Sequence, residues 1–233
     1  MCARYTPPRW DEMHAVHRAL PPENLPVGPV FPRGRGAFIR QVPVPVPEAE
    51  TPELERELVV GQWALIPSFA KTAKLPYSTN NARWEGVPTA ASFRQSWARE
   101  QRCIIPVQEF FEPNWETGRN RWWAFRRADK QPFGLAGLWN TWLDPDSGER
   151  VESYTMLTIN ADSDPLMSRM HKPDPKLGPD QQDKRSVVVV ERAHWDLWLA
   201  GSRQQAIELL RLAPVEVFDH GPEEASAMGS LFD

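Results

Sequence analysis

The chain is a succession of short apolar runs that are rich in β-branched and aromatic residues and end at turn-forming residues. Runs of this kind are typical of β-strands. They predict strands at residues 58–66, 103–111, 122–125, 134–142, 154–159 and 187–190. Residues 28–36 have the Gly and Pro content of an irregular loop, and the Val-Pro alternation of residues 42–47 is typical of an edge strand or a polyproline segment.

Helical patterns are fewer and shorter than the strand patterns. Because strands dominate and do not alternate regularly with helices, the pattern favours an α+β fold over a doubly wound α/β fold. The 24 prolines also argue against a helical bundle, since proline interrupts helices. The predicted helices cover residues 11–20, residues 92–100 with Ser92 as the N-cap, and residues 192–200 and 203–212 with Gly201 and Ser202 between them.

Length and charge narrow the class of protein. A chain of 233 residues with 41% hydrophobic residues can bury a core and fits one large domain. The net charge of −4 argues mildly against a nucleic-acid partner. The charge is uneven, however: residues 1–126 have 16 Lys and Arg against 13 Asp and Glu, a balance of +3, whereas residues 127–233 have 11 against 18, a balance of −7. The cations of the first half are nearly all arginines, which suit phosphate because they donate two parallel hydrogen bonds.

Cysteine usage indicates the cellular compartment. The chain has only Cys2 and Cys103, and it shows no charged leader and no long apolar span. We therefore expect a reduced, cytoplasmic protein without a disulfide or a membrane segment, and a monomer by default. Cys103 lies in an apolar run, where a buried and unreactive thiol is expected. His14 and His17 have no further ligands clustered near them, so we expect no metal site, and no phosphate-binding loop or other cofactor motif is present.

Cys2 is the most informative residue for function. Methionine aminopeptidases remove an initiator Met when a small side chain follows, so loss of Met1 would make Cys2 the first residue. Its α-amine, with a pKa of about 8, and its thiol, with a pKa of about 8.5, would both be available as nucleophiles near neutral pH. Such an aminothiol captures aldehydes, because the amine forms a Schiff base and the thiol closes a thiazolidine ring. On position alone, Cys2 could equally belong to a frayed terminus.

Three further segments place polar groups where strands and turns have no particular need for them. Each residue alone has a routine explanation as a turn, strand-end or surface residue. Together with Cys2 they have the composition of an aldehyde-capturing site, which needs a carboxylate of raised pKa and a histidine to move protons, an amide for orientation, and cations for phosphates. The segments are residues 80–85 with Asn81, Arg83 and Glu85, residues 105–113 with Glu109 and Glu112, and residues 168–173 with His171.

The ordered set of motifs resembles the SRAP family, the SOS response-associated peptidases or abasic-site processing proteins. The resemblance covers nearly the whole chain and implies one domain over residues 1–233, with a strongly bent, barrel-like, mainly antiparallel β core and flanking short helices. The motifs are Met-Cys-x-Arg-Tyr at residues 1–5, Asn-Ala-Arg-x-Glu at 81–85, Phe-Phe-Glu at 110–112, Gly-Leu-Ala-Gly-Leu-Trp at 134–139, and His171.

This resemblance also implies roles for single residues. Cys2 would cross-link to the ring-opened aldehyde of an abasic site in single-stranded DNA, after the protein has removed its own Met1. Asn81 would position the amine and the sugar, Glu112 would assist ring opening and proton transfer, and His171 would be a second acid/base or an orienting group. The protein would then join the nucleoid after DNA damage. Arg4 and Arg83 would bind phosphates, with Glu85 bracing one of them.

Three positions depart from the family pattern. Ala3 replaces the glycine of Cys-Gly-Arg, and residues 28–33 lack the usual Asn-x-Ala-Pro. The arginine of His-x-Arg-Met-Pro is also missing after His171, so Lys172 or Arg169 would have to supply its phosphate contact. Independently of the resemblance, exposed aromatic side chains such as Trp63, Phe69 or Trp84 could stack on bases.

Two other functions remain open at this point. The first is a cysteine peptidase that acts on other proteins, for which His171 is the attractive base. The second is a noncatalytic module for single-stranded DNA, which would keep its affinity and its salt dependence after Cys2 is changed. Single strands are favoured as the substrate because a stacked duplex hides the sugar carbon, and extruding it costs a few kcal/mol.

Overall fold

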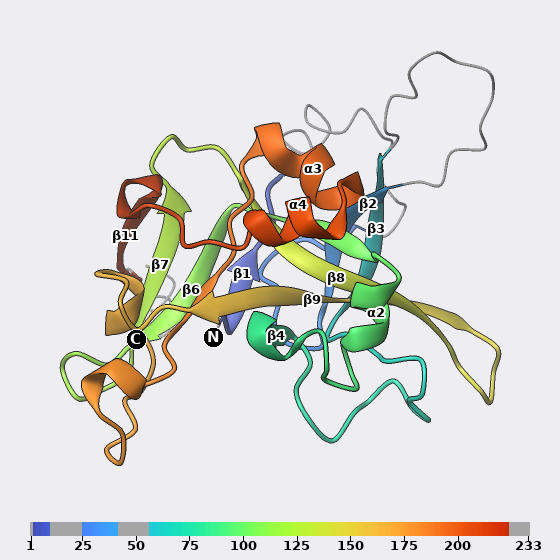
Figure 1. Ribbon diagram of the computed structural model, residues 1–233, viewed down its shortest axis with the longest axis horizontal. Helices are drawn as coiled ribbons and strands as arrows, with labels where there is room; N and C mark the ends of the chain where they lie inside the picture. Colours follow the sequence, from blue (N-terminus) through green and yellow to red (C-terminus); the bar gives the residue numbers. More distant parts are fainter. Residues whose placement is uncertain (1, 10–24, 42–55, 224–233) are drawn as a thin grey trace, which may run out of the picture.

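The computed structural model describes residues 2–9, 25–41 and 56–223 (Figure 1). In this part of the chain, the strands form two sheets that lie side by side. The smaller sheet is antiparallel, in the order β1-β6-β7-β11, with β1 (Arg4–Thr6), β6 (Glu109–Asn114), β7 (Arg121–Arg127) and β11 (Phe218–Pro222). The larger sheet contains β2 (Arg35–Gln41), β3 (Arg56–Trp63), β4 (Asn81–Arg83), β5 (Arg102–Val107), β8 (Phe133–Leu143), β9 (Arg150–Asn160) and β10 (Arg185–Val187).

The larger sheet closes into a barrel because β9 pairs at both ends of the order β3-β2-β5-β8. Most of these ladders are antiparallel, but β3 and β4 run parallel to β9. The expected α+β class with a barrel-like, mainly antiparallel core is therefore confirmed. β9 also pairs with β4 and β10. It therefore connects the barrel to β4, which begins with the candidate site residue Asn81.

The strand predicted at residues 103–111 is two strands in the structure. β5 belongs to the barrel and β6 to the smaller sheet, and the chain changes sheet at Gln108, whose N–H donates to the carbonyl of Thr6 on β1 (2.8 Å). Gln108 and Glu109 interrupt the apolar run at this point, but the strands on both sides are largely buried, so hydrophobicity alone does not show that the chain changes sheet there. β2 was not predicted, and β10 overlaps the strand predicted at residues 187–190 only at Val187.

Short helices cover one side of the barrel in Figure 1. The prediction of Gly201 and Ser202 between two helices is confirmed, and Ser202 caps the second one in a capping box with Gln205. Ser92 does not cap the helix that follows it, because that helix begins later, after Phe93. The helices are α2 (Arg94–Ala98), α3 (Trp195–Ala200) and α4 (Arg203–Glu208), with single 3₁₀ turns η1 (Trp84–Gly86), η2 (Met167–Arg169), η3 (Pro179–Gln181), η4 (Arg192–His194) and η5 (Val215–Val217). The predictions for residues 11–20 and 42–47 lie outside the described residues.

Each barrel strand sends alternate side chains into two hydrophobic clusters. On β2, Phe38 joins the cluster that contains the smaller sheet, whereas Ala37 and Ile39 join the cluster beneath the helices. Cys2 and Tyr5 belong to the first cluster. The start of the chain is therefore packed between the barrel and the smaller sheet, where a frayed terminus is not expected.

A close approach at Gly36 locks β1 against the barrel. The hydroxyls of Tyr5 on β1 and Tyr154 on β9 form a buried hydrogen bond of 2.5 Å directly beside Gly36 of β2. A β-carbon on residue 36 would lie 2.1 Å from both hydroxyl oxygens, so only glycine fits there. This contact fixes the strand that begins two residues after Cys2.

The structure also bears on the expectations for disulfides and membrane segments. Cys103 is a buried free thiol, as predicted; Cys2 is also a buried free thiol, which the sequence did not predict. None of the helices in the described part of the chain is long and apolar enough to span a membrane.

Candidate active site

Antiparallel pairing of β1 with β6 brings Cys2 next to Glu112. Arg4 lies opposite Phe111 in the ladder, and the N–H of Ala3 reaches the Phe111 carbonyl at 3.5 Å. Going back along β1 corresponds to going forward along β6, so Cys2 lies at the end of β6 that carries Glu112. Two segments more than a hundred residues apart in the sequence therefore meet at the candidate site.

The Cys2 thiol is kept protonated by its surroundings. The residue is only 1% exposed, and its Sγ donates to the carbonyl of Arg4 (3.5 Å). Burial raises the pKa of the thiol far above its ordinary value, and the negative charge of Glu112 raises it further. The expected titration of this thiol near about 8.5 is therefore wrong for this protein. A nearby base must take the proton before the sulfur can react.

Glu112 and His171 form a buried acid–base pair. Nε2 of His171 lies 2.8 Å from Oε2 of Glu112, and Glu112 is 0% exposed. Burial alone would raise the pKa of the Glu112 carboxyl, but the positive charge of the amino terminus and that of His171 lower it more, as do their hydrogen bonds. The pKa is therefore below its ordinary value, and the expected raised pKa is wrong. Glu112 is therefore ionised at neutral pH.

The backbone brings His171 to this pair through an isolated bridge between Met170 and Asn114 at the end of β6. The N–H of His171 donates to the carbonyl of Pro113 at 2.6 Å. His171 itself has a φ of 63°, in the left-handed region that few residues other than glycine adopt. A residue held in this conformation next to a reactive group is a common feature of functional sites.

Asn81 completes the group from the other sheet. It begins β4, which pairs with β9, and its Nδ2 donates to the carbonyl oxygen of Cys2 at 2.8 Å. Its Oδ1 is buried and has no hydrogen-bond partner among the described residues. The amide therefore fixes Cys2 through one atom and has an acceptor available for a substrate hydroxyl or a liberated amine.

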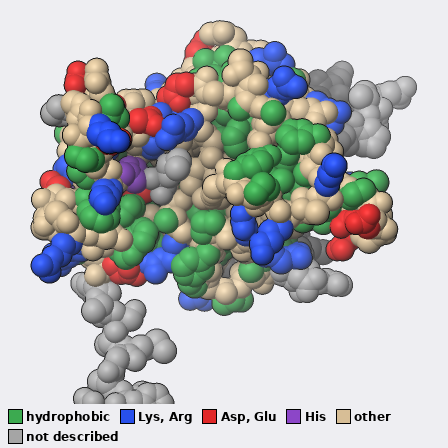
Figure 2. Space-filling view, turned by 90° about the horizontal axis from the view of Figure 1, so that it is seen from below, with side chains coloured by type: hydrophobic (Ala, Val, Ile, Leu, Met, Phe, Trp, Pro, Cys, Tyr) green, Lys and Arg blue, Asp and Glu red, His purple; other side chains and the backbone are tan. Residues whose placement is uncertain are grey.

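The cations that were expected to bind phosphate lie near the site with other partners. Arg4 lies 3.8 Å above the ring of Phe111 and pairs with Glu223 at 2.5 Å. Arg83 pairs with Asp183 (2.8 Å), and its side chain is still 57% exposed. Lys172 is exposed and lies 5.3 Å from the ring centre of Trp115. Figure 2 shows Lys and Arg side chains around a hollow in which histidine surface is visible.

Two of the three proposed stacking residues are not free aromatic surfaces. Trp63 is 0% exposed, and its indole N–H donates to the carbonyl of Asn80 (2.8 Å), so the expectation of base stacking by Trp63 is wrong. Trp84 is half-buried and packs edge-on against Trp97 of α2. Phe69 is 59% exposed. Alternation along a strand predicts that some tryptophans are buried, but it does not say which face points inward.

Two residues next to the site were missed. Arg185 is 3% exposed and pairs with Glu85 (2.7 Å), so Glu85 braces Arg185 rather than Arg4 or Arg83. Lys184 is 7% exposed, and its Nζ donates to the carbonyls of Met170 and His171. No sequence motif marks these residues, because their partners lie in segments that are distant in the sequence. Two charged residues at the start of an apolar strand are the one signal that could have drawn attention to them.

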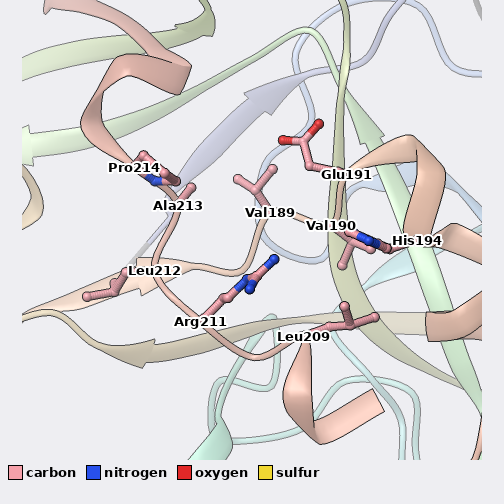
Figure 3. A pocket seen from close by; sticks show the side chains of 9 residues that line it. All are labelled: Val189, Val190, Glu191, His194, Leu209, Arg211, Leu212, Ala213 and Pro214. Atoms are coloured by element: carbon pink, nitrogen blue, oxygen red, sulfur yellow. The ribbon is translucent and has the colours of Figure 1, made fainter. Parts of the chain in front are cut away.

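A small pocket of about 70 Å³ lies elsewhere, between the end of the β10 segment and the helices (Figure 3). It contains none of the candidate site residues. Within the described residues, no group of His, Cys, Asp and Glu side chains is arranged to hold a metal ion. The pocket is lined by Val189, Val190, Glu191, His194, Leu209, Arg211, Leu212, Ala213 and Pro214.

The fold is a closed mixed barrel joined to a smaller sheet, and the site between them buries Cys2 beside a Glu–His pair. The chain belongs to the SRAP family: the family model described as "SOS response associated peptidase (SRAP)" matches residues 1–222. The resemblance seen in the sequence is thereby confirmed.

Similar proteins support this assignment. The "Abasic site processing protein HMCES" of Xenopus tropicalis is 27% identical over 147 residues, which cover 50% of this chain and 40% of that protein. The "Abasic site processing protein YoqW" of Bacillus subtilis is 30% identical over 124 residues, 53% of this chain and 54% of that one. The match therefore spans about half the length of these relatives. A crystal structure of a Bordetella bronchiseptica protein, 33% identical, covers 96% of this chain and 100% of its own, with a TM-score of 0.81.

Proposed function

We propose that this protein processes abasic sites in DNA by capturing the lesion covalently through Cys2. The observation that carries the proposal is the burial of Cys2 beside the Glu112–His171 pair, with Asn81 bonded to its backbone. The names of the similar proteins from X. tropicalis and B. subtilis support DNA with abasic sites as the substrate class.

The capture needs a free amine and a thiol on the same residue. Hydrolysis of the bond between Met1 and Cys2 would release methionine and leave the α-amine of Cys2 exposed. That amine would add to the aldehyde of the ring-opened sugar and lose water to form a Schiff base. The thiol would then add to the same carbon, and its proton would pass to the nitrogen as the thiazolidine closes. The overall reaction joins the aminothiol to the aldehyde and releases one water molecule.

The electrostatics of the site favour this order of steps. The amine reacts first because burial keeps the thiol protonated. The Glu112 carboxylate, which its lowered pKa keeps ionised, is the base that takes the thiol proton at ring closure, and the hydrogen bond to His171 gives that proton a route onward. The same pair would deliver a proton to the ring oxygen when the sugar opens. We further propose that Glu112 and His171 serve the removal of Met1.

Single-stranded DNA is the proposed form of the substrate. Cys2 is almost completely buried, so the sugar must come to it, and a base-paired, stacked strand cannot bend inward without a cost of a few kcal/mol. The exposed cations Arg83 and Lys172, and Arg4 once released from Glu223, would hold the flanking phosphates.

The test is a denaturing gel of the protein after incubation with an abasic single-stranded oligonucleotide. We expect a shifted band whose mass equals protein minus methionine plus oligonucleotide minus water. Cys2→Ala should abolish the band, whereas Cys103→Ala, which removes the other buried thiol, should leave it. A band that survives Cys2→Ala, or no band with the unaltered protein, would rule out the proposal.

The same geometry disfavours a cysteine peptidase acting on other proteins. Such an enzyme needs a thiolate, and burial together with the charge of Glu112 opposes its formation. The Nε2 of His171, which would have to activate the thiol, is bonded to Glu112 instead. A noncatalytic DNA-binding module is distinguished by the gel, since it would form no covalent band.

A further inference from the structure

Lys184 is unusually placed for a lysine. It is only 7% exposed, and its Nζ donates to the carbonyl oxygen of Met170 at 2.6 Å and to that of His171 at 2.7 Å. Lysine is seldom buried unless its ammonium group is bonded. Here the ammonium is directed at two successive carbonyls of the segment that presents the imidazole to Glu112. The ammonium group therefore stabilises the backbone of the candidate site through hydrogen bonds and does not point into solvent.

The backbone that Lys184 contacts is the part of the site with the least favourable conformation. His171 has a φ of 63°, which crowds a residue that carries a β-carbon. Its N–H is fixed by the Pro113 carbonyl of β6 (2.6 Å), and its carbonyl is fixed by Lys184. Strained conformations persist only where the surroundings hold them, and these two bonds hold both sides of the residue.

Lys184 is itself anchored to the barrel. Its N–H donates to Oδ1 of Asp162 (2.7 Å), and its carbonyl accepts from the N–H of Ala161 (2.7 Å), just after β9 ends. β10 then begins at the next residue and pairs with β9. The ammonium thus connects the barrel to a loop whose other side is bonded to the smaller sheet.

We propose that Lys184 is a positioning residue that keeps His171 in the left-handed conformation in which its Nε2 meets Glu112. The inference rests on the proposed function, in which that pair moves protons. Without the ammonium, the peptide after His171 loses its donor and the residue relaxes toward a common φ. The direction of the Cα–Cβ bond changes with that rotation, and the imidazole leaves Glu112. Lys184 touches no reacting atom and acts only through His171.

The first test compares Lys184→Met with Lys176→Met. Both remove an ammonium from the same stretch of chain, but Lys176 is exposed. With abasic single-stranded DNA, we expect Lys184→Met to lower the maximal rate of cross-linking by about tenfold or more, while the half-saturating DNA concentration changes by less than about twofold. Lys176→Met should match the unaltered protein. An unchanged maximal rate in Lys184→Met overturns the inference.

A double-mutant cycle separates positioning from general destabilisation. If Lys184 acts through His171, adding Lys184→Met to His171→Gln should lower the rate by less than about twofold more. Independent losses that multiply would contradict the inference. Variants are compared below their unfolding temperatures, and Lys184→Gln replaces the Met variant if that one does not fold.

A measurement without DNA keeps the inference separate from the proposed function. The imidazole resonances of His171, assigned by their loss in His171→Gln, should move toward those of an unstructured histidine in Lys184→Met and stay in place in Lys176→Met. Resonances that do not move in Lys184→Met overturn the inference even if cross-linking occurs. If the unaltered protein forms no cross-link, the proposed function fails, and the resonances still decide whether Lys184 positions His171.

Discussion

At the scale of single residues, Glu112 combines complete burial with a lowered pKa. Burial favours the neutral acid, so the carboxylate is maintained by its charged neighbours, the amino terminus and His171. This arrangement makes Glu112 the group on which both proton movements of the proposed reaction depend. Two predictions follow from it.

Replacement of Glu112 by Gln should slow cross-linking by about 100-fold or more, the range that general acid–base groups contribute. The amide keeps the size of the side chain but cannot take a proton from the thiol. The measurement is the initial rate of adduct formation near pH 7. Glu109→Gln, the same change on the same strand, is the control and should keep the rate. Equal rates for the two variants would exclude Glu112 as the base.

Lowering the pH should remove the contribution that ionised Glu112 makes to the free energy of unfolding. A carboxyl with a lowered folded-state pKa stabilises the native state above its unfolded-state pKa of about 4.3, and this contribution is lost as the pH falls through the folded-state pKa. The difference in free energy of unfolding between the unaltered protein and Glu112→Gln should therefore shrink as the pH falls from about 6 to about 3. Urea unfolding at several pH values measures it. A difference that stays constant would contradict the lowered pKa.

At the scale of elements, Glu223, the residue after β11, forms an ion pair with Arg4 of β1. Arg4 is expected to bind a DNA phosphate, but in this structure the carboxylate of Glu223 occupies the position beside its guanidinium. A partly exposed pair of this kind contributes about 1 kcal/mol or less, so phosphate can displace it. The residue that follows β11 therefore controls how available Arg4 is to phosphate.

Glu223→Gln should strengthen binding to undamaged single-stranded DNA by up to about fivefold at low salt, since it frees Arg4 and removes a negative charge. Glu149→Gln, which changes the same charge on the exposed turn between β8 and β9, controls for net charge. Fluorescence anisotropy with a labelled oligonucleotide measures both dissociation constants. The same gain in both variants would mean that only net charge matters.

Helix α4 depends on its cap more than α2 does. The side chain of Ser202 accepts from the N–H of Gln205, whereas Ser92 makes no cap and lies 3.5 Å from the Tyr77 hydroxyl. Ser202→Ala should lower the free energy of unfolding by about 1 kcal/mol, and Ser92→Ala by less than about 0.5 kcal/mol. Chemical denaturation measures both. A larger loss for Ser92→Ala would contradict the assigned caps.

At the scale of the whole molecule, the contact at Gly36 joins the barrel to the smaller sheet. Gly36→Ala should displace the Tyr5 and Tyr154 hydroxyls, lower the free energy of unfolding by about 1–3 kcal/mol and disturb the position of Cys2. Gly86→Ala is the matched control, because a β-carbon there meets no atom within 4 Å. Thermal unfolding and the cross-linking rate measure the two effects. No difference between the variants would show that the hydroxyl pair can move without cost.

The fold class and the set of candidate site residues could be predicted from the sequence. Strand and helix runs gave the α+β class, because their periodicity reflects burial directly. Cys2, Asn81, Glu112 and His171 could be found because each lies in a short motif, and the structure brings Cys2, Asn81 and Glu112 together with His171. Their roles remain predictions.

The rest could not be predicted, because it depends on which strands become neighbours. The change of sheet at Gln108 depends on pairing with β1 and not on local hydrophobicity, and the burial of Trp63 depends on which face of β3 points inward. The pKa of Glu112 is set by charges from both ends of the site. Lys184 contacts a backbone thirteen and fourteen residues away, so no local pattern marks it.

The three-residue strand β1 is held on both sides, by the ladder with β6 and by two hydrogen bonds between Tyr5 and Val30. A DNA strand joined to Cys2 would therefore be attached to the folded core of the protein rather than to a flexible terminus. A translocating enzyme that pulls on that DNA strand would have to separate β1 from both neighbours before Cys2 could be displaced from the protein core. The anchoring of this short strand would therefore make the cross-linked protein an obstacle that resists mechanical force.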